Sequence, residues 1–224
     1  MNDARTVILS QVRASLGWDG GTLPQPLQET LEERLSSSPV TIQPTMPTEP
    51  DELCEHFVTR LEAVAGTVVR VSGFADVPSI ILAHLDRYQL PPRIVMSQDG
   101  ILDEISWPDR LTRRHGTATD DDHMSVTGAF AAVAETGSLV LVSGDKTPTT
   151  LNFLPEEHVV ILDKRQIVPY PEDVWESIRT AFTTLPRTIN FITGPSRTAD
   201  IEQTMQLGAH GPRRLTVILI EGEH

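Results

Sequence analysis

The segment TINFITGPSRTADIE occupies residues 188–202 and joins an apolar run, 188–192, to a glycine–proline turn and a polar stretch. A second turn follows at 208–213, and a second apolar run occupies 215–220. Short, near-continuous apolar runs are typical of buried strands, and Gly-Pro followed by Ser and Thr is typical of a helix start. The order therefore predicts a strand, a tight turn, a short helix, another turn and a strand.

The same alternation extends from this segment back to residue 50. Because unbroken apolar strands between helices are typical of sheets buried on both sides, we expect an α/β fold with a mainly parallel sheet and helices on both faces. Outside 188–220, the expected strands are 67–71, 93–96, 138–142 and 159–162. The expected helices are 51–65, 77–90, 101–107 and 172–183.

The first 49 residues differ in character from the rest. Apolar residues at helical spacing predict a helix over 3–17 that ends at Gly17. Five prolines lie between Pro24 and Pro47, which indicates an extended arm with one short helix near 30–35. We therefore expect an N-terminal helical and proline-rich extension over 1–49 and one α/β domain over 50–224.

Charge and composition exclude several classes of protein. Eighteen basic and 31 acidic residues give a net charge of 18 − 31 = −13, which disfavours binding to nucleic acid or to an anionic membrane surface. Cys54 is the one cysteine, so we expect a buried structural thiol, no disulfide and no iron–sulfur cluster in this chain. With neither a membrane span nor a signal sequence in view, we expect a cytoplasmic protein.

The turn at residues 193–198 predicts a binding site for a small carboxylate or phosphate. A helix that starts there would present free backbone N–H groups beside Gly194, Ser196 and Thr198. Arg197 would add a fork-shaped cation suited to either anion. Between residues 187 and 214 there are four arginines and two acidic residues, which is a local excess of positive charge in an acidic chain. The alternative is ordinary helix capping.

Two further residues are candidates for acid–base work. Glu135 lies between a run of small residues and a glycine turn, and we expect it at the rim of the sheet, as a base or a nucleophile. The alternative is a carboxylate that braces the turn through backbone N–H groups. His210 lies in a glycine-flanked turn and is a candidate acid, base or ligand donor, or equally a histidine bonded to backbone.

Metal and nucleotide sites are not predicted. The group His115, Asp120 to Asp122 and His123 lacks the spacing of metal ligands and is typical of a solvated turn. The segment 143–147 lacks the upstream glycine of a phosphate loop, and no dinucleotide fingerprint occurs. We therefore expect no metal and no cofactor bound by this chain.

The chain resembles the LUD-domain family through four segments: 134–138 (AETGS), 154–159 (LPEEHV), 194–202 (GPSRTADIE) and 210–213 (HGPR). The resemblance implies a fold like that of the sugar-phosphate isomerase and CoA-transferase group. It implies a role in bacterial oxidation of L-lactate to pyruvate beside two iron–sulfur partner proteins, which would hold the clusters. It also pairs these segments as walls of one pocket, with binding residues Thr136, Gly137, Gly194, Ser196, Arg197, Thr198 and Arg213, beside Glu135 and His210.

Three functions stay open at this point. The chain is a subunit of a lactate-oxidising complex, a stand-alone enzyme acting on an acyl-CoA, sugar-phosphate or folate-like substrate, or a non-catalytic assembly factor that docks through its proline-rich arm. A catalytic role for the Glu135 carboxylate would favour the stand-alone enzyme. That role rests on fold-level analogy with CoA transferases.

Overall fold

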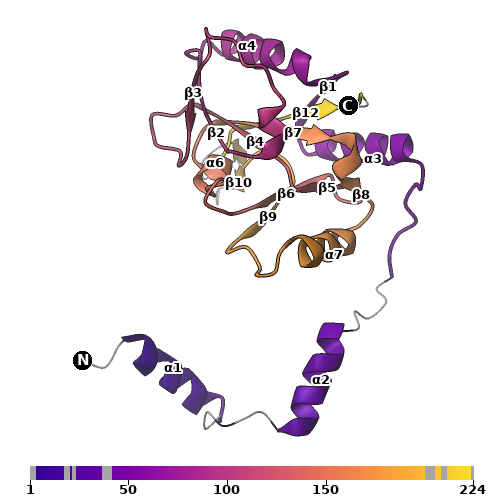
Figure 1. Ribbon diagram of the computed structural model, residues 1–224, viewed down its shortest axis with the longest axis vertical. Coiled ribbons are helices and arrows are strands. Elements are labelled where there is room, and N and C mark those ends of the chain that lie inside the picture. The colour runs from indigo at the N-terminus through magenta and orange to yellow at the C-terminus, as the bar shows by residue number, and fades with distance from the viewer. Residues whose placement is uncertain are drawn as a thin grey trace. The chain divides into compact units, whose positions relative to one another are not determined.

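A computed structural model describes residues 4–17, 21, 24–36, 42–199, 205–207 and 211–222 of the chain (Figure 1). The chain divides into two units, residues 1–43 and 44–224. The first unit contains α1 (Ala4–Ser15) and α2 (Gln25–Ser36). The expected helix over 3–17 is confirmed. The second helix begins earlier than expected, and side-chain bonds from Gln25 to Glu29 and from Gln28 to Glu32 support its first turns.

A six-stranded sheet forms the centre of the second unit, in the order β1-β12-β7-β4-β2-β3. Every neighbouring pair in it is parallel, which confirms the expected α/β class. Its central strands β4 and β7 are fully buried along their length; the apolar run 159–162 predicted β7, whereas β4 was not predicted. The strands are β1 (Thr67–Val71), β2 (Arg93–Met96), β3 (Thr112–His115), β4 (Met124–Gly128), β7 (Glu157–Asp163) and β12 (Arg214–Ile220).

A second sheet of four strands, in the order β8-β5-β6-β9, was not expected. Its strands β5 and β6 form an antiparallel hairpin, and β6 pairs antiparallel with β9, with Val142 opposite Ile189. The two apolar runs on either side of the Gly-Pro turn therefore lie in different sheets, because β9 joins this sheet and β12 joins the main one. The strands are β5 (Ala131–Val133), β6 (Ser138–Val142), β8 (Ile167–Val168) and β9 (Ile189–Ile192).

The main sheet has helices α4 (Val77–Arg87) and α5 (Gly100–Asp103) on one face, and helix α3 (Pro50–Ala63) with the second sheet on the other. Apolar side chains of α4 and α5 pack on the first face. The opposite face packs against β5, β6 and α3, which carries the buried Cys54. Helix α7 (Pro171–Ala181) covers the outer face of the second sheet (Figure 1). Helices thus lie on both faces, as expected, and the second sheet covers part of one face beside α3.

The helix expected after the Gly-Pro turn is wrong. Residues Arg197–Ala199 form strand β10, which pairs antiparallel with β11 (Met205–Leu207). The Ser196 amide donates to the Pro212 carbonyl over 2.9 Å, so the backbone enters β10 tied to the turn before β12. An extended backbone held in this way cannot present a helix start.

The remaining regular segments are short: α6 (Thr150–Phe153) and two 3₁₀ turns, η1 (Phe74–Asp76) and η2 (Lys164–Gln166). Among the described residues, no helix combines the length and the apolar character that a membrane crossing requires.

Candidate functional site

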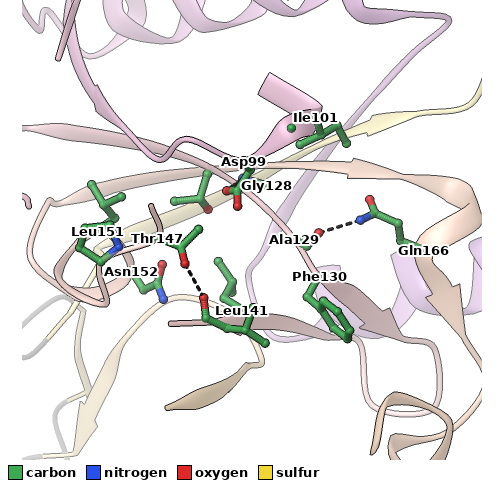
Figure 2. Close-up of a pocket in the computed structure, with 14 residues that line it drawn as sticks. Asp99, Ile101, Gly128, Ala129, Phe130, Leu141, Thr147, Leu151, Asn152 and Gln166 are labelled. Atoms are coloured by element: carbon green, nitrogen blue, oxygen red, sulfur yellow. Dashed lines mark hydrogen bonds between the residues drawn. The ribbon is translucent and has the colours of Figure 1, made fainter. Parts of the chain in front are cut away.

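A cavity of about 250 Å³ opens where β2, β4 and β7 end at their carboxyl termini, between the two sheets (Figure 2). We call it the Asp99 cavity. Parallel α/β sheets bind ligands at this edge because the strand ends and following loops converge there. Its polar lining includes Asp99, Gly128, Thr147, Asn152 and Gln166, and its apolar lining includes Phe130.

Several of these polar groups hold the backbone around the cavity. Gln166 donates through Nε2 to the Ala129 carbonyl over 2.7 Å, and Thr147 donates through Oγ1 to the Val142 carbonyl over 2.9 Å. Both bonds are drawn in Figure 2. Among the described residues of the lining, Asp99 carries the one acidic group.

Asp99 is the residue of this cavity best suited to move a proton. Burial raises the pKa of its carboxyl, although the Ser97 hydroxyl and the Gly128 amide, which donate to Oδ2 over 2.5 and 2.9 Å, oppose that shift. No lysine or arginine lines the cavity. It therefore favours a ligand group without negative charge.

A second cavity, of about 220 Å³, lies at the amino ends of β7 and β12 and is called the His158 cavity. It contains two residues that the sequence predicted, Gly194 and Ser196, together with Gly211. Gly194 has φ +89°, and a Cβ there would lie 2.7 Å from the Val64 carbonyl oxygen, so only glycine fits. The two predicted residues thus share a cavity, although at the amino end of the sheet.

His158 is the most unusual group in this second cavity. It is 1% exposed, and its Nε2 lies 2.9 Å from the Thr127 hydroxyl. Among the described residues, its Nδ1 has no hydrogen-bond partner. Burial lowers the pKa of the imidazole to about 3, so the ring is neutral at physiological pH.

The two cavities adjoin. Asn152 of α6 lines both of them, and Thr127 lines the Asp99 cavity while it contacts His158. Short α6 therefore stands between the carboxyl-end cavity and the amino-end one.

The AETGS turn lies beside the Gly-Pro turn, as the resemblance implied. Ser138 Oγ lies 2.7 Å from Thr136 Oγ1 and 2.6 Å from Thr193 Oγ1, which joins the two turns through three hydroxyls. Gly137 has φ +68° and packs directly on the backbone of α3. Glu135 is half-buried, its amide donates to the Pro169 carbonyl, and it lines neither cavity.

The predicted arginines lie outside the cavity. Arg197 and Arg213 are exposed, and each directly follows a residue that lines the His158 cavity. The Ser196 amide, expected to be free for an anion, is bonded to Pro212. Thr198 lies in β10, and His210 lies outside the described residues.

The described part of the chain contains no group of three or more His, Cys, Asp or Glu side chains placed to hold a metal ion. Sequence reasoning missed Asp99, Asn152 and His158. The one signal for His158 was a histidine at the head of an apolar strand, a position where an imidazole must be buried.

A family model described as the LUD domain matches residues 118–220. Over these residues the chain is similar to the LUD domain, as the sequence resemblance predicted. It is 34% identical over 118 residues to Lactate utilization protein C of Geobacillus sp. (strain WCH70), an alignment that covers 51% of this chain and 48% of that protein. The chain thus spans about half the length of that relative.

Two further comparisons agree with this similarity. Lactate utilization protein C of Halalkalibacterium halodurans is 29% identical over 167 residues, covering 73% of this chain and 70% of that protein. The crystal structure of a DUF162 family protein from Deinococcus radiodurans superposes with a TM-score of 0.58 at 22% identity, over 78% of this chain and 99% of that one. The second comparison supports the fold.

The segment that matches the LUD model contains the whole lining of one cavity and only part of the lining of the other. All residues that line the His158 cavity fall within 118–220, whereas Asp99 and the loop that follows it lie before residue 118. The lining of the His158 cavity therefore lies entirely within the segment that matches the LUD model.

Proposed function

We propose that this protein acts in the oxidation of L-lactate to pyruvate and binds a small 2-hydroxy or 2-keto carboxylate in the His158 cavity. The observation that carries the proposal is that the matched LUD segment contains the whole lining of this cavity. Relatives named Lactate utilization protein C align with this chain. A cavity of about 220 Å³ has room for a three-carbon acid.

We assign the ligand's carboxylate to the side of the cavity formed by Ser196 and Pro212, the residues that precede Arg197 and Arg213, and call this side the arginine-bearing edge. Arg197 and Arg213 each follow a lining residue, and neither has a carboxylate partner among the described ion pairs. A guanidinium at that edge would attract the acid to an otherwise acidic protein. Thr136 and Gly137 support this edge through the hydroxyl chain and the packing on α3.

The electrons removed from lactate are assigned to iron–sulfur partner proteins. With one cysteine, buried in α3, this chain does not offer the four thiolates of a common cluster. The chain would then hold the acid while a partner accepts electrons. Catalytic roles for Glu135 and His210 stay predictions.

Titration calorimetry tests this proposal with L-lactate and pyruvate, alone and with the partner proteins present. We expect binding in at least one setting, weakened at least about tenfold in Arg197→Ala through loss of a charge-assisted bond. Arg187→Ala, another exposed arginine of the same basic segment, is the matched control and should bind as the parent does. Absence of binding in both settings would contradict the proposal.

The Asp99 cavity favours a second candidate function, that of a stand-alone enzyme. A carboxyl with a raised pKa at the carboxyl ends of parallel strands is a candidate general base. Since its lining lacks basic residues, it would hold an uncharged part of an acyl-CoA, sugar-phosphate or folate-like substrate. If turnover of such a substrate is lost in Asp99→Asn but kept in Glu135→Gln, the result would support Asp99 as the general base of this enzyme. The reverse pattern would support Glu135 as the catalytic residue.

A further inference from the structure

The His158 imidazole has a hydrogen-bonding atom without a partner in the described part of the chain. Nε2 lies against Thr127, while Nδ1 is buried and no described residue bonds to it. Leaving a buried polar atom unpaired costs stability, so native proteins usually pair such an atom with a ligand or water. Here the ring lines a cavity with room for either.

The lining around this ring is neutral. Ser196 contributes a hydroxyl and Asn152 an amide, and the other lining residues are glycine, proline and apolar side chains. A carboxylate at this depth would find no charge to balance it. A hydroxyl or carbonyl oxygen would find three uncharged hydrogen-bonding groups.

The Thr127–His158 contact allows either kind of oxygen to bind. When the Thr127 hydroxyl donates to Nε2, the ring proton sits on Nδ1, which then donates to a carbonyl. When Nε2 carries the proton and donates to Thr127, Nδ1 accepts from a hydroxyl. Rotation of one O–H bond accompanies the change of tautomer.

We propose that Nδ1 of His158 hydrogen-bonds the oxygen on carbon 2 of the bound acid, so that the cavity accepts both the 2-hydroxy and the 2-keto form. This inference rests on the proposed function, since it assigns the uncharged end of the same ligand. The ligand's carboxylate stays at the arginine-bearing edge. The site therefore selects against an acid of equal size that lacks the carbon-2 oxygen.

Propionate is the discriminating ligand, because it keeps the carboxylate and lacks that oxygen. We expect L-lactate and pyruvate each to bind the full chain at least about tenfold more tightly than propionate, since propionate leaves Nδ1 unpaired. In His158→Leu the three acids should bind with similar affinity. Thr127→Val, which removes the tautomer partner, should reduce the discrimination as well.

Nitrogen NMR of the imidazoles supplies a readout that does not depend on how a variant folds. With the unsubstituted protein, L-lactate and pyruvate should each shift the His158 Nδ1 signal, and in opposite directions, because one oxygen donates and the other accepts. Propionate should shift it little. His84, whose Nε2 is held by Glu157 at 2.8 Å, is the internal reference and should not move.

The outcomes separate the two proposals. Equal binding of all three acids, or binding that leaves the His158 signals in place, would overturn this inference while the carboxylate-binding proposal stands. Binding by none of the acids, with or without the partner proteins, would overturn both. Selective binding with a shifted Nδ1 signal supports both.

Discussion

Glu157 is the most deeply buried acidic side chain among the described residues, with 1% exposure, and it bonds to His84 and Arg214 at the start of β7. Its Oε2 lies 2.8 Å from His84 Nε2, and its Oε1 contacts Arg214. Arg214 in turn lies over the Tyr88 ring, 3.9 Å from its centroid. A buried carboxylate of this kind is tolerated only because its partners are in place.

We expect Glu157→Gln to lower the free energy of unfolding by about 3 kcal/mol, because it leaves Arg214 without its counter-charge. Urea denaturation measures the change. Glu55→Gln is the matched control: its ion pair with Arg70 is solvent-exposed, so a loss below about 1 kcal/mol is expected. Equal losses in the two variants would show that burial does not set the strength of the Glu157 cluster.

Asp99 makes stability depend on pH in a direction that follows from its raised pKa. Protonation favours the folded state, so this contribution is full below the unfolded pKa of about 4 and is lost as the pH rises through the folded pKa. Asp99→Asn removes the titration. It should therefore stabilise the protein relative to the parent more at pH 7 than at pH 4.

Denaturation at the two pH values measures that difference. Asp109→Asn, at an exposed carboxylate that is not among the groups that shift the Asp99 pKa, is the control and should change stability little at either pH. A benefit of Asp99→Asn that is larger at pH 4 would contradict the raised pKa.

Gly137, in the turn of the β5–β6 hairpin, packs directly on the backbone of helix α3. A Cβ on Gly137 would lie 2.6 Å from the Leu61 amide nitrogen, and the residue has φ +68°. We expect Gly137→Ala to lower the free energy of unfolding by more than about 3 kcal/mol, since the clash adds to the backbone strain.

Gly116→Ala separates the cost of backbone strain from the cost of the clash. Gly116 also has a positive φ, +106°, but a Cβ there meets nothing within 4 Å. It should cost about 1 kcal/mol through strain alone. Equal costs in calorimetric unfolding would show that α3 yields to a methyl group at Gly137.

At this scale the sequence predicted most elements but not their pairing. Strand β2 matches its predicted range of 93–96, and β1 matches 67–71, because apolar runs between glycine or proline turns mark strands directly. The second sheet was missed, since its ladders join residues as distant as Val142 and Ile189. Hairpin β10–β11 was mistaken for a helix because the bond from Ser196 to Pro212 is equally non-local.

The whole molecule brings together residues whose function no local pattern marks. Gly194 and Ser196 were predicted from a motif, whereas Asp99, Asn152 and His158 come from a loop, helix α6 and strand β7. Their convergence depends on the strand order, in which β12 lies between β1 and β7. A single sequence does not reveal that order.

All buried residues of the four apolar clusters lie after residue 43. We therefore expect residues 44–224 alone to unfold within about 2 °C of the full chain in calorimetry. They should bind lactate with unchanged affinity. A fall in the melting temperature of more than about 5 °C would assign a structural role to residues 1–43.

The account as a whole depends on which cavity receives the acid. The most direct measurement is a crystal structure of the protein with pyruvate bound. We predict pyruvate in the His158 cavity, with its carboxylate toward Arg197 and Arg213 and its keto oxygen within hydrogen-bond distance of His158 Nδ1. Pyruvate in the Asp99 cavity, with the His158 cavity holding only water, would contradict the account.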